Sequence, residues 1–421
     1  MLGKKIAIVG FGAEGRATLK LIRRDPAYRH AEVWVLDRNA TLSLPRGIKS
    51  ILGEQYLDSL ADFDVIFRTP GVPFLLPQIQ RAMRRGSVVS SVTDLFFQKF
   101  RGTIIGVTGT KGKGTTTTLL YRILKRAGKD AHLAGNIGTP AIALLPRLKK
   151  TSIAILELSS FQLQGLRHSP RYAVVLGVFP DHQDSHKTMR EYVDAKANIA
   201  AHQKKSDTIF FVSDNALSRR IAQKSGGKRI PVSPRGWDLF SPHDLVIPGA
   251  HNYLNAVVAG TVARHLDIAD AIIRSVARSF KGLPYRIQFV REVNGVRMYN
   301  DSASTNPQTT IAAVKSFSNP VILIAGGKNK GLDYAPLSEA LASSTVKFAV
   351  LFGENKDLIG RHIPASVPSV YADTLTDAVA AAMSHASSGD VVVFSPGSAS
   401  FDMFKNYKDR GAQFDKIVKN L

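Results

Sequence analysis

The chain of 421 residues contains no cysteine. Disulfide bonds, thiolate metal sites and a cysteine nucleophile are therefore excluded, and nothing points to an oxidising compartment. No uninterrupted apolar stretch is long enough to cross a bilayer. The opening residues, MLGKKIAIVGFG, lack the apolar core and the small-residue cleavage site of a signal peptide. These absences predict a cytoplasmic protein without a membrane span.

Acidic residues are scarce: 33 Asp and Glu face 56 Lys and Arg, and the net charge is +23. Such an excess attracts nucleic acid, anionic membranes or phosphorylated substrates. No run reaches five like charges, and the denser clusters, such as Arg81, Arg84 and Arg85, have helical spacing. We therefore expect most of this charge to lie on solvated helix faces that attract anions in general, and a nucleic-acid or membrane surface is the less favoured reading.

Apolar residues make up 44% of the chain, which is enough for packed cores, and the length suits two or three domains. Strand-like and helix-like stretches alternate, which predicts an α/β fold with parallel sheets. The motifs divide the chain into segments 1–99, 100–283 and 284–421. We expect an N-terminal Rossmann-like domain, a central P-loop ATPase-like parallel sheet and a C-terminal Rossmann-like domain.

Several apolar runs are expected to be strands, and ligands should bind at their carboxyl ends. Their ranges are 5–9, 31–37, 64–71, 87–92, 103–109, 152–157, 172–178, 208–213, 321–327, 347–353 and 390–397. The stretch 115–128 is amphipathic and ends at a glycine, which predicts a helix.

A glycine-rich loop, GVTGTKGKGTT, lies between the predicted strand 103–109 and this helix. Glycines let backbone N–H groups turn towards phosphate oxygens, and the helix N-terminus adds its dipole. Lys113 would reach the β- and γ-phosphates, and Thr115 would bind Mg²⁺, because Gly114 occupies the usual hydroxyl position. An ordinary strand-to-helix turn is less favoured, since four glycines and two lysines fall between residues 106 and 114. The predicted ATP-binding residues here are Gly109, Thr110, Lys111, Gly112, Lys113, Gly114, Thr115 and Thr116.

Two further strand ends carry groups that could hold a metal. Glu157 ends one predicted strand, and a carboxylate beside a phosphate loop suits Mg²⁺. His182 follows the strand at 172–178, where a histidine either ligates a metal or caps a loop.

The first segment contains a second glycine motif, Gly10-x-Gly12-x-x-Gly15, after a strand, and Asp37 lies 22 residues beyond Gly15. This is the dinucleotide fingerprint, which supports an oxidoreductase that uses NAD as an alternative function. The motif equally fits a UDP-sugar, because it places a nucleotide diphosphate on a helix N-terminus.

Taken together and in order, the motifs resemble the Mur ligase family. The shared stretches cover nearly the whole chain: GTKGKGT at 109–115, AGNIG at 134–138, ELSSFQL at 157–163, HNYLN at 251–255, GLPYR at 282–286, NDSASTNP at 300–307, AGGKNKG at 325–331 and SPGSASFDMFKNYKDRG at 395–411.

The resemblance implies an ATP-dependent, ADP-forming ligase of three domains that makes an amide bond through an acyl phosphate. The most similar members add D-glutamate to UDP-N-acetylmuramoyl-L-alanine in peptidoglycan precursor synthesis. It further implies ATP, two Mg²⁺ ions and, in this chain, a monomer.

The resemblance also assigns roles by position. Catalysis falls to Lys113, His182 and Lys196, and metal binding to Thr115, Glu157, His182 and a carbamylated Lys196. Besides the phosphate loop, ATP would contact Asn252, Asn255, Arg286 and Asp301. The substrates would contact Gly12, Asp37, Thr69, Pro70, Gly71, Asn136, Ser159, Thr305, Lys330, Ser400 and Tyr407.

Some positions depart from the family pattern. Members that add D-glutamate usually carry a lysine where this chain has Ala303, and Lys328 is a candidate to replace it. The Gly-Lys-Gly loop with a following hydroxyl also occurs in folylpolyglutamate synthases. A ligase of the same fold that uses another amino acid or a folate is therefore an alternative, although the uridine-binding first segment argues against the folate.

Overall fold

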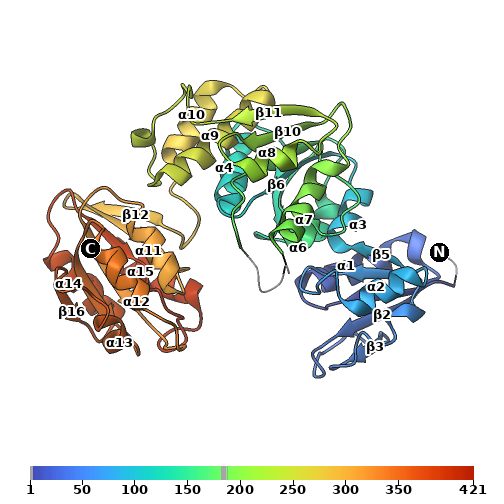
Figure 1. Ribbon diagram of the computed structural model, residues 1–421, viewed down its shortest axis with the longest axis horizontal. Helices are drawn as coiled ribbons and strands as arrows, with labels where there is room; N and C mark the ends of the chain where they lie inside the picture. Colours follow the sequence, from blue (N-terminus) through green and yellow to red (C-terminus); the bar gives the residue numbers. More distant parts are fainter. Residues whose placement is uncertain (1–2, 182–185, 187) are drawn as a thin grey trace. The chain divides into compact units, whose positions relative to one another are not determined.

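A computed structural model describes residues 3–181, 186 and 188–421, and its three sheets follow one another along the chain (Figure 1). The chain forms two compact units: residues 1–236 with 255–273, and residues 237–254 with 274–421. The first unit contains the first two sheets, and the second unit contains the third.

The first sheet is entirely parallel, which is the arrangement predicted for a Rossmann-like domain. In spatial order its strands are β3 (Lys49–Leu52), β2 (Glu32–Asp37), β1 (Lys5–Val9), β4 (Val65–Arg68) and β5 (Val88–Ser91). Its helices are α1 (Ala13–Arg24), α2 (Pro77–Arg84) and α3 (Val92–Lys99).

The second sheet has six parallel strands. Their order is β11 (Lys228–Val232), β10 (Thr208–Val212), β9 (Tyr172–Val175), β6 (Thr103–Thr108), β8 (Ile153–Glu157) and β7 (Ala131–Gly135). The helices of this region are α4 (Lys113–Arg126), α5 (Ala141–Leu144), α6 (Ser160–Leu163), α7 (Met189–Ala201) and α8 (Ala216–Ala222). Two further helices, α9 (Ala250–His265) and α10 (Asp270–Ser279), have residues in both units.

The third sheet is parallel except for one edge strand. Its order is β12 (Gln288–Val293), β13 (Val296–Asn300), β17 (Val391–Phe394), β14 (Val321–Gly326), β15 (Val346–Phe352) and β16 (Ser369–Tyr371). Its helices are α11 (Pro307–Val314), α12 (Ala335–Ala342), α13 (Lys356–Gly360), α14 (Leu375–Ser384) and α15 (Tyr407–Lys419).

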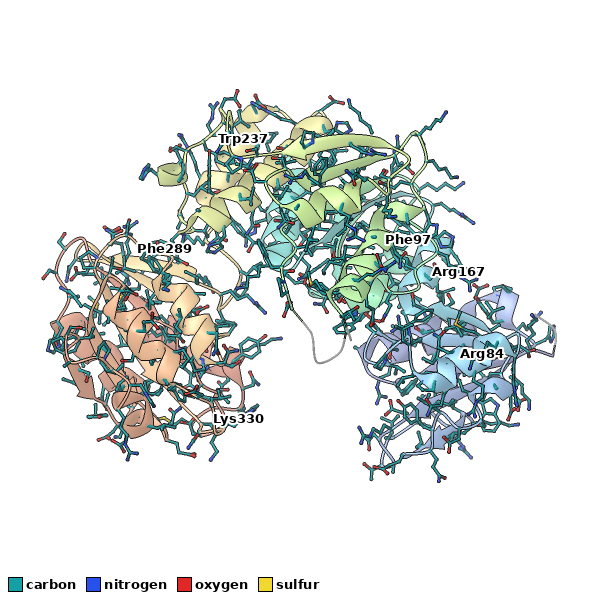
Figure 2. The ribbon with its side chains drawn as sticks, viewed as in Figure 1. Arg84, Phe97, Arg167, Trp237, Phe289 and Lys330 are labelled. Carbon is teal, nitrogen blue, oxygen red and sulfur yellow. The ribbon has the colours of Figure 1, made fainter. Side chains whose placement is uncertain are left out.

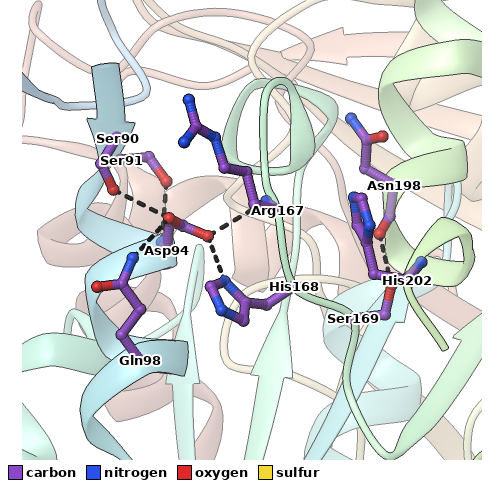
Figure 3. A network of polar contacts seen from close by, with 9 residues as sticks. All are labelled: Ser90, Ser91, Asp94, Gln98, Arg167, His168, Ser169, Asn198 and His202. Atoms are coloured by element: carbon purple, nitrogen blue, oxygen red, sulfur yellow. Dashed lines mark hydrogen bonds and ion pairs between the residues drawn. The ribbon is translucent and has the colours of Figure 1, made fainter. Parts of the chain in front are cut away.

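The first two sheets share core residues. From α3, Phe96 and Phe97 pack into the core of the second sheet, and Figure 2 labels Phe97. In return, Ile142 of α5 packs into the core of the first sheet. The buried carboxylate of Asp94 accepts hydrogen bonds from the backbone N–H of Arg167 at 3.2 Å and contacts His168 Nδ1 at 2.7 Å (Figure 3). The first two domains are thus joined by apolar and polar contacts.

The apolar runs predicted as strands are strands, and the helix predicted at 115–128 is α4, which begins two residues earlier. Six strands were not predicted: β3, β7, β11, β12, β13 and β16. All but β13 lie at the edge of a sheet, where the chain is half solvated and the apolar run is weak. Across the described residues, no helix combines the length and apolar character needed to span a membrane.

Candidate active site

The predicted phosphate loop connects β6 to α4. Gly112 caps α4 with φ of 85°, a left-handed conformation that favours glycine. A Cβ atom at Gly112 would also overlap the side chain of Asn255. The fold therefore brings the loop and Asn255 of α9, both predicted to bind ATP, into contact.

Two lysines from distant parts of the sequence converge on this loop. Lys113 Nζ donates to the carbonyl oxygens of Gly109 at 3.0 Å and Thr110 at 2.9 Å. Lys196 Nζ, from α7, donates to the same Gly109 oxygen at 3.0 Å. Two predicted catalytic residues thus share one acceptor, where both could neutralise a phosphate.

Lys196 is 1% exposed, and its Nζ lies 4.5 Å from the centre of the Tyr192 ring. Burial and the charge of Lys113 together lower the pKa of Lys196 to about 7, and Asp181 opposes the change. A large fraction of this amine is therefore neutral near neutral pH. The neutral amine is the nucleophilic form that carbamylation requires.

The predicted magnesium ligands surround the same loop where the structure describes them. Glu157 is buried at the end of β8, in register with Val107 of β6, and Asn136 Nδ2 donates to its Oε1 at 3.3 Å. Thr115 lies in the first turn of α4. His182 lies outside the described residues. A hydroxyl and a buried carboxylate beside a phosphate loop fit the oxygen preference of Mg²⁺.

Within the described part of the chain, no three His, Cys, Asp or Glu side chains form a group that could hold a metal. The predicted set contains only one such described side chain, Glu157.

A cavity of about 890 Å³ opens beside the glycine motif of the first domain. It is lined by six predicted substrate residues: Gly12, Asp37, Thr69, Pro70, Gly71 and Asn136. Gly10 has φ of 87°, and a Cβ atom there would overlap Thr69 Oγ1. Glycine thus allows the loop to approach the end of β4.

The carboxylate of Asp37 shapes this cavity. Its Oδ2 accepts from Phe11 N at 2.6 Å, and its Oδ1 accepts from Asn39 N at 2.8 Å. Burial and the charge of Asp37 both raise the pKa of Tyr56, which also lines the cavity. Asp37 therefore holds the glycine loop in place.

Glu14 was not singled out from the sequence, although it lies inside the glycine motif. It lines the cavity, and its Oε1 accepts from Gln162 Nε2 at 3.2 Å. Burial raises the pKa of Glu14, while the bond from Gln162 and the charge of Arg68 oppose this. Ser159, predicted to contact substrate, does not line the cavity, but its backbone N–H donates to Gln162 Oε1 at 3.0 Å.

Arg68 is a second residue that sequence patterns did not reveal. It is 1% exposed and donates to the carbonyl oxygens of Val72 at 2.7 Å, Phe161 at 2.9 Å and Gln164 at 3.0 Å. It ties the cavity loop of the first domain to α6 of the second. The sequence signal that could have revealed this role is an arginine at the end of an apolar strand.

In the second unit, the predicted ATP residue Asp301 is buried at the end of β13. Its Oδ1 accepts from Ile287 N at 3.1 Å, and its Oδ2 accepts from Ser395 Oγ at 2.7 Å. Burial raises the pKa of Asp301 to about 7, and the nearby charges of Arg286 and Arg410 oppose the change. Its predicted partner Arg286 is therefore close enough to act on it.

The remaining predicted residues of the second unit are more scattered. Asn252 is buried and donates to Pro248 O at 2.7 Å, whereas Thr305 is exposed. Ser400 is buried, and Lys330 Nζ lies 5.3 Å from the centre of the neighbouring Phe401 ring. The carbonyl oxygen of Tyr407 accepts from Ser302 Oγ at 2.9 Å. Lys328, the candidate to replace the lysine missing at Ala303, forms an ion pair with Glu354.

Arg410 stabilises this region. Sequence patterns did not assign it a role, although it lies in the motif NYKDRG. It is fully buried and donates to the carbonyl oxygens of Ala399, Ser398 and Ser302 at 3.2, 3.0 and 2.9 Å. Burial lowers its pKa to about 10. It fixes the two loops that carry Asp301 and Ser400.

The chain is similar to known proteins over nearly its whole length. Residues 107–238 match the Mur ligase middle domain, and residues 285–397 match the Mur ligase, glutamate ligase domain. A UDP-N-acetylmuramoylalanine–D-glutamate ligase from Acetivibrio thermocellus is 38% identical, over 99% of this chain and 97% of that protein. One from Clostridium kluyveri is 35% identical over the same shares.

The chain belongs to the Mur ligase family.

Solved structures have the fold of this Mur ligase. A UDP-N-acetylmuramoyl-L-alanyl-D-glutamate–2,6-diaminopimelate ligase has a TM-score of 0.59 at 16% identity, covering 100% of this chain and 93% of that one. MurF ligase from Thermotoga maritima, solved with ADP, has a TM-score of 0.58 at 18% identity, covering 100% and 96%.

Proposed function

We propose that this Mur ligase uses ATP to join D-glutamate to UDP-N-acetylmuramoyl-L-alanine, releasing ADP and phosphate in peptidoglycan precursor synthesis. The observation that carries the proposal is the similarity, over 97% of their length, to relatives that bear the name of this reaction. An oxidoreductase would leave the phosphate loop without a role, and a folate ligase would leave the cavity of the first domain without one.

The chemistry needs positioned anions rather than a covalent nucleophile. The substrate carboxylate attacks the γ-phosphorus of ATP and forms an acyl phosphate and ADP. The amine of D-glutamate then attacks the acyl carbon, and the tetrahedral intermediate expels phosphate. Catalysis of this kind depends on alignment and on cations near the transferring phosphoryl group.

We expect Lys113 and Lys196 to supply these cations, the latter before it is carbamylated. Both amines lie at Gly109, at the start of the loop that would cradle the phosphates. When ATP enters, Lys113 would exchange its bonds to loop carbonyls for bonds to phosphate oxygens. The neutral amine of Lys196 would form an N–C bond with CO₂ and release one proton to solvent, which leaves an anionic carbamate.

Thr115 and Glu157 would hold one Mg²⁺, and the carbamate of Lys196 with His182 a second. Bound there, Mg²⁺ would neutralise phosphate charge during the transfer. The hydroxyl and the carboxylate at this loop support the assignment of the first ion, and carbamylation would supply an anionic ligand for the second.

The substrates would be divided among three domains. Residues 1–99 would bind the UDP-substrate, with its diphosphate at the N-terminus of α1 and the cavity around it. Residues 100–283 would bind ATP. Residues 284–421 would bind D-glutamate through Lys330, Thr305, Ser400 and Tyr407. We expect the chain to act as a monomer in the cytoplasm.

The test is phosphate release from ATP and Mg²⁺ with UDP-N-acetylmuramoyl-L-alanine and a panel of amino acids that includes D- and L-glutamate. Release that depends on D-glutamate is expected. Release with a different amino acid would keep the ligase and overturn its substrate, which is the outcome that Ala303 would favour. No release with any amino acid would reject the proposal.

A further inference from the structure

The second sheet carries exposed basic side chains ahead of every one of its strands. These side chains share two properties: each is exposed, and each either lies among the four residues before a strand or is the first residue of a strand. They are Arg101 before β6, Lys129 before β7, Lys149 and Lys150 before β8, Arg171 before β9, Lys204 and Lys205 before β10, and Lys224 and Lys228 at β11.

The topology gathers these residues on one edge. All six strands are parallel and begin nearly in register: Ile153 pairs with both Ala131 and Thr103, and Thr208 pairs with both Tyr172 and Lys228. At about 4.8 Å between strands, the row of strand starts is about 24 Å wide.

Helix α4 leads back from the carboxyl end of β6 to the start of β7, so its last turn reaches the same edge. That turn adds the exposed residues Lys125 and Arg126. We call these eleven residues the basic edge.

The positive charge of the basic edge is poorly compensated. The loops that lead into the strands contain two acidic residues, Asp130 and Asp207, and Asp267 follows α9. Asp130 accepts from Ser152 Oγ and contacts His132, and Asp207 accepts from Lys204 N at 2.7 Å. Among the ion pairs of the described residues, none includes a side chain of the basic edge.

This charge lies away from the chemistry. The phosphate loop and Glu157 follow the carboxyl ends of β6 and β8, whereas the basic edge lies at the amino ends. A strand of five or six residues spans about 17–20 Å. The basic edge therefore cannot contact ATP in the loop, and a ligand on this edge would leave the loop open.

We propose that the basic edge docks the protein reversibly on an anionic membrane surface, through the headgroups of acidic phospholipids. A row of exposed lysines suits such a surface, because each positive charge is attracted without a specific geometry. The distance to the phosphate loop would let the docked enzyme keep its active site accessible.

The composition of the edge favours a membrane over nucleic acid. Eight of the eleven residues are lysines, whereas arginine supplies the planar fork that recognises phosphates and bases. Proteins that bind single strands also offer aromatic rings for stacking. The exposed large apolar side chains of the described residues are all outside the basic edge: Leu75, Val88, Phe179, Tyr371, Phe401, Met403 and Leu421. Without an apolar anchor, binding would be purely electrostatic and would weaken with salt.

The experiment measures binding of the full chain to phosphatidylcholine vesicles with and without phosphatidylglycerol, by co-sedimentation at several salt concentrations. The edge variant carries K149Q, K150Q, K204Q and K205Q. The control variant loses the same charge from the first domain through K20Q, R24Q, R84Q and R85Q. All eight positions are exposed and outside the cavity and the loop.

The wild-type chain and the control variant should bind only the vesicles with phosphatidylglycerol, and added salt should release them. Each lysine near an anionic surface contributes about fivefold to binding, so the edge variant should bind more than about a hundredfold more weakly. Ligase turnover in solution should be the same in all three proteins, which separates this proposal from the proposed function.

Three results would overturn the proposal. The first is the absence of vesicle binding by the wild-type chain at moderate salt. The second is an equal loss of vesicle binding in both variants. The third is tight binding of single-stranded RNA or duplex DNA that the edge variant loses while vesicle binding stays weak. That outcome would reassign the edge to nucleic acid.

Discussion

At the scale of single residues, the chemistry of the site depends on a few side chains. Burial changes their pKa values, and the fold sets their hydrogen-bond partners. Lys113 and Lys196 donate to one carbonyl oxygen, and only Lys196 is fully buried. Asp301 is a buried carboxylate whose oxygens already accept two hydrogen bonds. Each of these three residues gives a prediction.

Lys113→Ala should lower kcat by about 10²–10³-fold, because it removes a cation from the transferring phosphoryl group. The UDP-substrate should still bind, since Lys113 does not line the cavity of the first domain. Phosphate release and calorimetric titration of the UDP-substrate measure the two effects. Lys111→Ala, on the exposed part of the same loop, is the matched control and should lose much less. Unchanged turnover in Lys113→Ala would remove the loop from the mechanism.

Lys196→Ala should also lose activity, and short carboxylic acids such as acetate should restore part of it. The reason is that a free carboxylate can occupy the place of the missing carbamate. Phosphate release with increasing acetate measures the rescue, and Lys205→Ala, at an exposed position, provides the control. If Lys196→Ala kept full activity, Lys196 would be a structural residue only.

Asp301 should make the stability of the chain depend on pH. Its pKa is about 7 in the folded chain, above the ordinary 3.8. Between these values the folded state holds a proton that the unfolded state has lost. The protonated Asp301 therefore makes its full contribution to the free energy of unfolding below about pH 4, and this contribution is lost as the pH rises through 7.

Asp301→Asn keeps an acceptor for Ile287 N but cannot ionise. Its free energy of unfolding should change less between pH 5 and pH 8 than that of the wild type. At pH 8 the variant should be more stable, on the order of 2 kcal/mol. Urea unfolding at the two pH values measures this, and Asp357→Asn, in an exposed turn of α13, should behave as wild type. A parallel pH dependence in Asp301→Asn and wild type would show that Asp301 ionises normally.

At the scale of elements, the glycines at the two ends of α4 have different tasks. Gly112 and Gly128 both have positive φ, at 85° and 74°. A Cβ atom at Gly112 would overlap Asn255, whereas a Cβ atom at Gly128 would meet no heavy atom within 4 Å.

Gly112→Ala should therefore weaken ATP binding more than tenfold, because Asn255 must move and the loop must change shape. Gly128→Ala should cost only the left-handed strain, about 1–2 kcal/mol of stability, with ATP affinity unchanged. Nucleotide titration and thermal unfolding of the two variants separate these effects. Equal ATP affinities would show that α9 does not support the loop.

The strands also show which parts of the fold can be predicted from sequence patterns. Buried parallel strands are recognisable as continuous apolar runs, and β6, β14 and β17 were predicted on that basis. The hairpin β12–β13 was missed, although its turn contains Asn294-Gly295, both with positive φ. Its strands carry charged residues on the solvated side, so no apolar run revealed them.

At the scale of the whole molecule, the first two sheets lie in one compact unit, although their motifs are separate in sequence. Arg68 joins them by donating to the carbonyl oxygens of Phe161 and Gln164. The rings of Phe96 and Phe97 fill the core of the second domain from the first.

Arg68→Met should destabilise both domains together by on the order of 3 kcal/mol, because buried carbonyl oxygens lose their donors. Hydrogen exchange should show reduced protection in β1 and β6 alike, while exposed Arg85→Met should leave both unchanged. Faster exchange confined to β1 would show that the two domains are stable independently.

The glycine loops, the strand-end carboxylates and the long motifs can all be read from the amino-acid sequence, and they are enough to indicate the family and its chemistry. Local patterns suffice there, because a loop that binds phosphate needs its glycines and lysine next to one another in the chain. Only the tertiary structure brought Lys196 to Gly109, Asn255 to Gly112, and Glu14 and Arg68 to α6. It also gathered the basic edge, whose residues look scattered along the chain. Those contacts depend on which strands lie side by side, and long-range packing decides that.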